Sequence, residues 1–288
     1  MCGIFGLIIN KKNYPYEKFN NLTNKLFILS EERGKDAAGI FFNHKTKFKA
    51  LKKILKPRQF IKNKEFKKFK KNNYDNFNNN EKFALIGQCR LATFGNKSSN
   101  ENNQPIEVDN ICGVHNGLIT NILSTKDSRN INEERFDDFS DTRFLFQQLN
   151  QNISLSNIVK SISKILKFQV GIINIAFCIK GKSKVYLFSN NGSLFICNSG
   201  NNYVFASEKK FLKEYLSQDK YFEDSKIQKL KINNLYSIDY DLNTYDEYNL
   251  DIKINKKNFN QNFQLKNNNV IKKYNFLKFK YDDISNLK

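Results

Sequence analysis

The chain has 288 residues, with 48 lysines and arginines against 28 aspartates and glutamates, a net charge of +20. Its length allows one domain with a sizeable core plus an appendage, and no apolar run is long enough to cross a bilayer. Five cysteines without a close CxxC pair argue against a disulfide framework and a structural zinc site, so composition predicts a soluble cytoplasmic protein without a metal or other cofactor.

The positive charge raises the question of a nucleic-acid partner, because a basic surface neutralises phosphates regardless of base sequence. The residue usage offers another explanation, since Lys, Asn, Ile and Phe are abundant while the chain has 3 Pro, 1 Met and no Trp, as expected from an AT-rich genome. No RNP-like or helix-turn-helix pattern accompanies the basic tracts. We therefore expect a solvated basic surface, with neither a nucleic acid nor a membrane as partner.

The N-terminal part of the chain is predicted to be rich in strands. Apolar runs and alternation predict strands over residues 2–9, 36–43, 48–55 and 82–93, with the second and third paired. A helix follows the first strand, because Phe19, Leu22 and Leu26 recur at helical spacing, and Gly34 is its predicted stop. The lysine-rich stretch and the asparagine-rich segment 72–82 are predicted to form a loop.

The remainder continues the same mixture of elements. A polar loop over 94–110 is followed by predicted strands over 111–120, 171–181, 183–189 and 193–200, helices over 139–152 and 155–169, a strand leading into a helix over 203–216, and a hairpin over 235–250. The sequence NNG at 190–192 is a hairpin signal between two of these strands. Strands joined mostly by turns predict antiparallel sheets with helices outside them.

Four separated blocks carry candidate chemistry: MCGIFG at the start, RGKDAAGI at 33–40, GQCRLATFG at 87–95, and HNGLITN at 115–121 with SDTRFLF at 140–146. Each block alone is weak, since HNG is most often a turn. In this order and spacing they resemble the glutaminase domain of the class II, N-terminal-nucleophile glutamine amidotransferases. The resemblance implies an α+β fold, an αββα four-layer sandwich of two antiparallel sheets, with the domain over 2–250 and a polar basic appendage over 251–288.

The resemblance implies that the protein hydrolyses the side-chain amide of L-glutamine through a cysteine thioester. Cys2 is then the nucleophile, and removal of the initiator methionine gives it a free α-amine that can accept the thiol proton. This amine and thiol have ordinary pKa values close to each other, so no histidine partner is needed. The alternative interpretation of Cys2 is a buried cysteine of the first strand.

The other matched residues correspond to the remaining needs of the reaction. By the resemblance, Asn116 and Gly117 form the oxyanion hole. Arg90 binds the carboxylate of glutamine, Thr93 positions the substrate, and Asp141 binds the ammonium group. The alternatives are a surface arginine at a strand end for Arg90, and a helix N-cap for Asp141.

The block at 33–40 is expected to shape the site rather than react, through Arg33, Gly34, Asp36 and Gly39. The sequence also departs from the family pattern. Leu91 stands where the amino-sugar-synthesising members carry tryptophan, Phe94 replaces their histidine, and Arg143 follows the DT pair where an acidic residue is common. These departures leave open to which branch the chain is related, and hence which acceptor receives nitrogen.

No synthase domain and no glycine-rich phosphate loop is recognisable after residue 250. We therefore expect a separate synthase or isomerase chain to accept the ammonia, docking beside the loop at 94–105, with amino-sugar or glycan biosynthesis as the candidate route. The alternative is that this loop is a disordered, asparagine-rich insertion. A rival hypothesis is a catalytically silent or nucleic-acid-associated protein that retains the fold.

Overall fold

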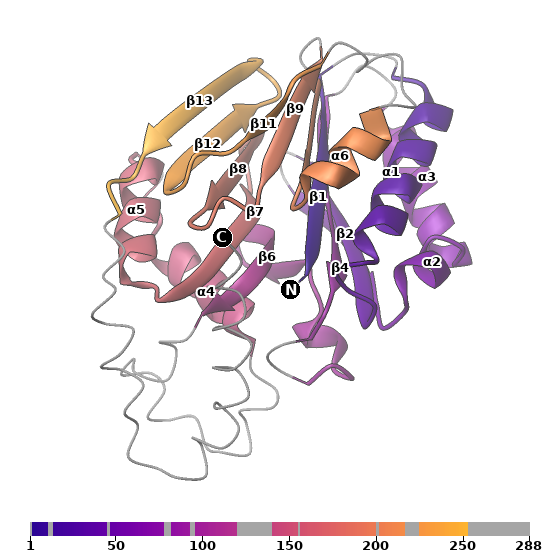
Figure 1. Ribbon diagram of the computed structural model, residues 1–288, viewed down its shortest axis with the longest axis horizontal. Helices are drawn as coiled ribbons and strands as arrows, with labels where there is room; N and C mark the ends of the chain where they lie inside the picture. The colour runs from indigo at the N-terminus through magenta and orange to yellow at the C-terminus, as the bar shows by residue number, and fades with distance from the viewer. Residues whose placement is uncertain are drawn as a thin grey trace. The chain divides into compact units, whose positions relative to one another are not determined.

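The computed structural model describes residues 2–10, 14–44, 47–77, 82–92, 96–119, 140–154, 156–199, 202–216 and 225–252 (Figure 1). The predicted appendage lies outside these residues from residue 253 onward, so the predicted boundary at 250 stays a prediction. Thr93 and Phe94 also lie outside the described residues.

The first sheet has the strand order β11-β9-β10-β1-β4-β2-β3, and its neighbours pair antiparallel. Its strands are β1 (Gly3–Ile9), β2 (Ala37–His44), β3 (Lys47–Lys53), β4 (Phe83–Arg90), β9 (Phe195–Ser199), β10 (Asn202–Ala206) and β11 (Ile227–Lys229). Strands β1 and β4 are buried throughout; β1 is continuously apolar, whereas β4 is apolar up to Gly87 and also buries Gln88 and Arg90. Cys2 therefore directly precedes a strand in the middle of this sheet, as expected.

The second sheet has the order β13-β12-β8-β7-β6-β5, again antiparallel throughout. Its strands are β5 (Ile106–Val108), β6 (Ile111–Ile119), β7 (Gly171–Ile179), β8 (Lys184–Ser189), β12 (Asn234–Asp239) and β13 (Thr244–Asn249). The long pair β6 and β7 runs in register from Ile111 opposite Ile179 to Ile119 opposite Gly171. Strand β6 of this pair carries the HNG sequence and lies next to the edge strand β5.

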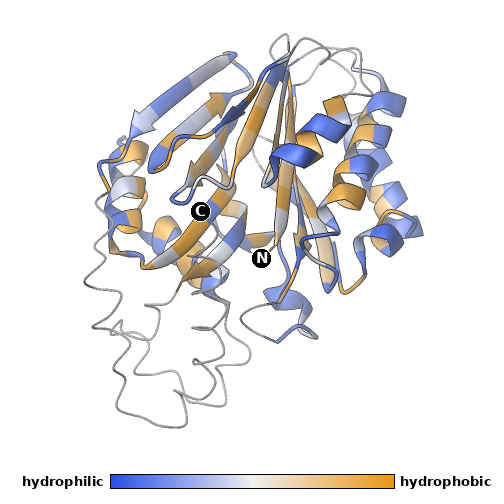
Figure 2. Ribbon diagram, viewed as in Figure 1, coloured by the Kyte–Doolittle hydropathy of each residue, from blue (hydrophilic) through white to orange (hydrophobic). Residues whose placement is uncertain are grey.

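Helices cover the outer face of each sheet (Figure 1). The first sheet is covered by α1 (Tyr16–Ser30), α2 (Pro57–Phe60), α3 (Lys64–Phe77) and α6 (Lys209–Leu216), and the second by α4 (Asp141–Asn152) and α5 (Ile158–Phe168). A short 3₁₀ turn, η1 (Asn100–Asn102), lies in the polar loop before β5. Figure 2 shows hydrophilic residues on the outward faces of the helices.

The buried apolar side chains form three layers, which separate the four layers of helices and sheets. One layer packs between the two sheets and includes Ile4, Ile86 and Val114. Another lies between the first sheet and its helices, and a third between the second sheet and α4 and α5. Successive side chains of a buried strand pack in opposite layers. Ile4 packs between the two sheets, and Phe5 packs against the helices. The predicted αββα sandwich is confirmed.

The loop predicted for the lysine-rich stretch is wrong over much of its length, because α2 and α3 form there. Helix α3 buries Phe66, Lys70 and Tyr74, which are spaced at i, i+4 and i+8 and therefore share one face. The lysines on its other faces obscure this apolar stripe in the sequence. A loop was predicted from the high charge of this segment, although its buried residues have helical spacing.

The predicted hairpin at residues 190–192 is also wrong, although a turn does form there. Strand β8 pairs with β7 and β12 in the second sheet, whereas β9 pairs with β10 and β11 in the first. The turn therefore carries the chain from one sheet to the other. Gly192 takes a positive φ of 75°, and its N–H donates to the hydroxyl of Ser189 at 2.8 Å.

Two findings concern membranes and thiols. None of the helices in the described ranges combines the length and the apolar character needed to span a membrane. All five cysteines are free and buried.

Candidate active site

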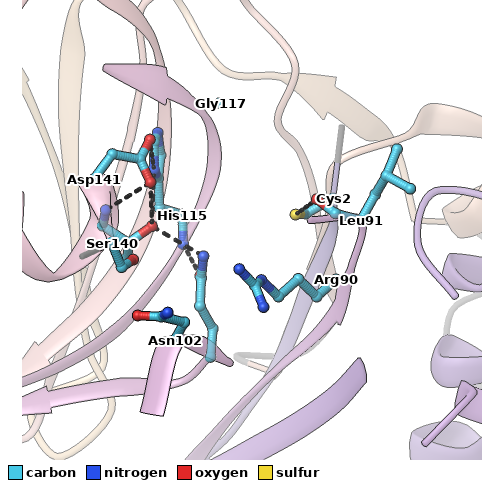
Figure 3. Close-up of a pocket in the computed structure, with 10 residues that line it drawn as sticks. Cys2, Arg90, Leu91, Asn102, His115, Gly117, Ser140 and Asp141 are labelled. Atoms are coloured by element: carbon cyan, nitrogen blue, oxygen red, sulfur yellow. Dashed lines mark hydrogen bonds and ion pairs between the residues drawn. The ribbon is translucent and has the colours of Figure 1, made fainter. Parts of the chain in front are cut away.

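A pocket lies where the end of β4 and the start of β1 face β6 and the first turn of α4. It is lined by Cys2, Arg90, Leu91, Asn102, Gln104, His115, Gly117, Ser140, Asp141 and Thr142, and it encloses about 270 Å³, part of it open to solvent. Figure 3 shows Cys2, Arg90 and Leu91 on one side, with His115 and Asp141 across from them. The pocket thus joins Cys2, Arg90, Gly117 and Asp141, four of the residues predicted for the reaction.

Cys2 reaches the pocket because it precedes the central strand β1. Its thiol donates a hydrogen bond to the carbonyl oxygen of Leu91 at 3.5 Å, and the residue is only 7% exposed. Burial raises the pKa of the Cys2 thiol, and the positive charge of Arg90 opposes this rise. The thiol therefore needs a base to accept its proton before it can attack.

Arg90 ends β4 with its guanidinium held by a second side chain. Its Nη1 donates to Oδ1 of Asn103 at 2.8 Å, and Lys52 Nζ donates to the carbonyl oxygen of Asn103 at 2.6 Å. Burial lowers the pKa of Arg90 from its usual value, while the charges of Cys2 and Asp141 oppose that shift. The bond to Asn103 fixes the direction in which the fork of Arg90 points.

The RGKD block contacts the backbone of pocket-lining residues. The Asp36 N–H donates to the carbonyl of Arg90 at 2.9 Å, and its Oδ2 accepts from the N–H of Ala92 at 2.9 Å. A Cβ added to Gly34 would lie 2.4 Å from the carbonyl carbon of Arg90, and one added to Gly39 would lie 2.0 Å from the carbonyl oxygen of Gln104. Side chains at these glycines would push the pocket walls apart.

Arg33 stands apart from the pocket. Its Nη1 pairs with Glu208, and among the described residues its Nε and Nη2 are buried without a hydrogen-bond partner. Its Cβ lies 3.2 Å from where a Cβ on Gly3 would be. Arg33 therefore adjoins the start of β1 without lining the cavity.

The two residues predicted for the oxyanion hole differ in position. Gly117 lines the pocket, and a Cβ there would lie 1.8 Å from the carbonyl oxygen of Ile172, so no larger residue fits this backbone. Asn116 is fully buried and is not among the lining residues. Within the described part of the chain, its side-chain Nδ2 and Oδ1 have no hydrogen-bond partner.

Asp141 is held at the start of α4. The N-cap is Ser140, whose side chain accepts from the N–H of Arg143, so the N-cap interpretation of Asp141 is wrong by one residue. Asp141 Oδ2 accepts from the N–H of Ile119 at 3.1 Å, and Oδ1 accepts from the N–H of Thr142 at 2.8 Å. A carboxylate in the first helical turn is also stabilised by the helix dipole.

The sequence interpretation missed several side chains that line the pocket, notably Gln104, His115 and Thr142. The backbone N–H of His115 donates to Gln104 Oε1 at 2.6 Å, and Gln104 Nε2 donates to Thr142 Oγ1 at 3.0 Å. His115 and Thr142 are adjacent in sequence to Asn116 and Asp141, which the motifs identified, and this adjacency could have indicated them. Gln104 lies in a polar loop without periodicity and offered none.

The described residues contain no group of three or more His, Cys, Asp and Glu side chains that could hold a metal ion. The polar groups of the pocket are instead suited to an organic ligand that carries charges of both signs. Arg90 supplies the positive side chain and Asp141 the negative one.

Comparison with known proteins gives a consistent result. Residues 88–214 match the family model described as a glutamine amidotransferase domain. The chain is 27% identical over 241 residues to the glutamine–fructose-6-phosphate aminotransferase (isomerizing) of Helicobacter pylori, covering 81% of this chain and 37% of that protein. The chain thus spans well under half the length of this curated relative.

Two solved structures share the fold. The glutamine phosphoribosylpyrophosphate amidotransferase of B. subtilis, complexed with ADP and GMP, superposes with a TM-score of 0.63 at 21% identity, covering 88% of this chain and 50% of that one. A structure described as the allosteric regulatory enzyme of purine biosynthesis gives a TM-score of 0.64 at the same identity and coverage. The chain therefore contains a class II glutamine amidotransferase domain with the fold of the N-terminal-nucleophile hydrolases.

Proposed function

We propose that this domain hydrolyses the side-chain amide of L-glutamine to glutamate and ammonia, with Cys2 as the nucleophile. The observation that carries the proposal is the convergence of one thiol and two oppositely charged side chains, Cys2, Arg90 and Asp141, on a single pocket. Arg90 binds the α-carboxylate of glutamine through its planar fork, and Asp141 binds the ammonium group. Gripping both charges aims the amide of the substrate at the thiol.

The reaction proceeds in two halves. The α-amine of Cys2, freed by removal of Met1, takes the thiol proton, and the sulfur attacks the amide carbon. Asn116 Nδ2 and the N–H of Gly117 stabilise the oxyanion, a use that accounts for the buried and unpaired side chain of Asn116. The amine returns the proton to the leaving ammonia, and water then hydrolyses the thioester to glutamate.

The direct test is glutamine turnover by the purified chain. Cys2→Ala is expected to abolish hydrolysis while the far-ultraviolet circular dichroism and melting temperature stay near those of the parent. Cys197→Ala is the matched control, because Cys197 is an equally buried thiol on β9 that does not line the pocket. Intact-mass measurement reports the state of the first residue. A fully active enzyme that retains Met1 contradicts the proposed role of the α-amine.

We further propose that the ammonia is used by a synthase or isomerase on a separate chain, with amino-sugar or glycan biosynthesis as the candidate route. The named relative in Helicobacter pylori, which is an aminotransferase, extends well beyond the 37% of its length that this chain covers. The polar loop at 94–105 is the proposed docking site. Thr93, which directly precedes this loop in the sequence, is proposed to position the substrate. Lys52 and Arg143 both donate to the carbonyl of Glu101 in this loop.

The partner proposal is tested by adding candidate synthases to the purified chain. Stimulated glutamine turnover and a complex on sizing support it, and Glu101→Lys on the loop should weaken that complex. Full activity alone, without stimulation or complex formation, would indicate a free-standing amidase.

A further inference from the structure

Three hydrogen-bonded side chains lie behind Asp141, and the proposed reaction leaves them without a role. They are Gln104, His115 and Thr142, here called the Thr142 relay, and they are 6%, 2% and 1% exposed. They come from three different segments, the polar loop, β6 and α4. Because buried polar groups are costly unless their hydrogen bonds are made, the position of each hydrogen in this relay is constrained.

The ring of His115 has one nitrogen whose state is fixed. Its Nε2 lies 3.1 Å from the carbonyl oxygen of Ile172, which can only accept, so Nε2 carries a hydrogen. The other nitrogen, Nδ1, lies 3.2 Å from Thr142 Oγ1. With the hydrogen on Nε2, Nδ1 is therefore the ring nitrogen that can accept from Thr142.

The hydroxyl of Thr142 has a similarly limited choice. The backbone N–H of His115 holds Gln104 Oε1 at 2.6 Å, so the amide nitrogen of Gln104 points to Thr142 Oγ1 and donates to it at 3.0 Å. The single hydroxyl hydrogen is left with two acceptors, His115 Nδ1 and Asp141 Oδ1, the latter at 3.3 Å. It can serve only one of them at a time.

We propose that His115 is a positioning residue that sets, through the Thr142 hydroxyl, how strongly Asp141 binds the ammonium group of glutamine; this rests on the proposed function. With Nδ1 as its acceptor, the Thr142 hydroxyl leaves the lone pairs of Asp141 free for the substrate. Without that acceptor, the hydroxyl hydrogen turns to Asp141 Oδ1, which lies 3.3 Å away. The hydrogen bond then weakens the attraction of Asp141 for an ammonium group.

The experiment measures the Kd of glutamine by calorimetry in a Cys2→Ala background, where no turnover occurs. We expect His115→Phe, which removes the acceptor Nδ1, to weaken glutamine binding roughly tenfold, the loss of about one charge-assisted hydrogen bond. In a Thr142→Val variant, which removes the hydroxyl and keeps the backbone donor to Asp141, the same histidine substitution should change the Kd by under about twofold. Thr142→Ser keeps the hydroxyl and should restore the full effect.

A melting experiment checks that each variant folds, and Thr142→Ala replaces Thr142→Val if the latter does not. An equal effect of His115→Phe with and without the Thr142 hydroxyl overturns the relay, and so does an unchanged Kd in His115→Phe itself. Absence of glutamine binding in the Cys2→Ala background is a different result, which overturns the proposed function as well.

Discussion

The proposed role of Arg90 requires the planar geometry of its guanidinium group as well as its positive charge. We expect Arg90→Lys to raise the KM for glutamine by roughly 10- to 100-fold, because lysine keeps the charge and loses the fork, at a cost of about 1.5–3 kcal/mol. Steady-state kinetics measures this. The control is Arg58→Lys, since the side chain of Arg58 is 64% exposed, pairs with Glu31 and does not line the pocket. Equal KM values for the two variants would remove Arg90 from the substrate site.

Asn103 offers a sharper test of the same group. Asn103→Asp retains an acceptor for Arg90 and turns the contact into an ion pair that competes with the carboxylate of the substrate. We expect it to raise the KM by roughly tenfold, more than Asn103→Ala does, although Ala removes the hydrogen bond entirely. Kinetic assays of both variants decide the point. The opposite ranking would mean that orientation of Arg90 matters more than its net charge.

At the scale of single residues, the sequence predicted those pocket residues that lie within a short recognisable motif. Cys2, Arg90, Gly117 and Asp141 were found in this way and do lie together. The partners that hold them were not found. Asn103 is 13 residues from Arg90, and Thr142 is 38 residues from Gln104. No local pattern encodes such pairs, because they exist only once the strands and loops are in place.

Helix α3 contains a buried lysine, Lys70, that makes the stability of the folded protein depend on pH. Lys70 is 1% exposed, its Nζ donates to Asn24 Oδ1 at 2.6 Å, and burial lowers its pKa to about 7. Between pH 7 and its ordinary pKa of 10.5, the unfolded chain holds this proton and the folded chain does not. The contribution of Lys70 to the free energy of unfolding therefore rises with pH across that window.

We expect Lys70→Met to raise the free energy of unfolding by roughly 1–3 kcal/mol at pH 7, because it removes the desolvation cost of the charge. The difference from the parent should shrink toward pH 10. Urea unfolding at several pH values measures both quantities. Lys68→Met, at an exposed position of the same helix, is the control and should show neither effect. A gain that does not vary with pH would mean that packing alone is responsible.

The same helix shows what local sequence can and cannot predict about elements. Strands with nearly continuous apolar runs, such as β1 and β7, were predicted correctly because burial on both faces leaves few polar positions. Helix α3 was missed because exposed lysines stand between its buried side chains and one of the buried side chains is itself a lysine. The turn at 190–192 was predicted as a turn, but its strands pair in different sheets. Pairing depends on contacts that are distant in sequence.

For the whole molecule, the net charge of +20 leaves the nucleic-acid hypothesis to be tested directly. We expect the chain to elute from a heparin column at moderate salt, as its charge requires, and to turn over glutamine at a rate that added RNA does not change. An activity assay with and without RNA measures this. Tight, salt-sensitive retention on RNA together with no glutamine turnover would favour the rival function.

The pocket takes one wall from each sheet, with Arg90 at the end of β4 in the first and Asp141 beside β6 of the second. A ligand that touches both walls ties the two sheets together and resists their sliding at that end of the sandwich. Saturation at about 100 times its Kd adds about 2.7 kcal/mol to the free energy of unfolding. The supply of glutamine or glutamate would then set how quickly proteases degrade the protein, so a starved cell would hold shorter-lived copies.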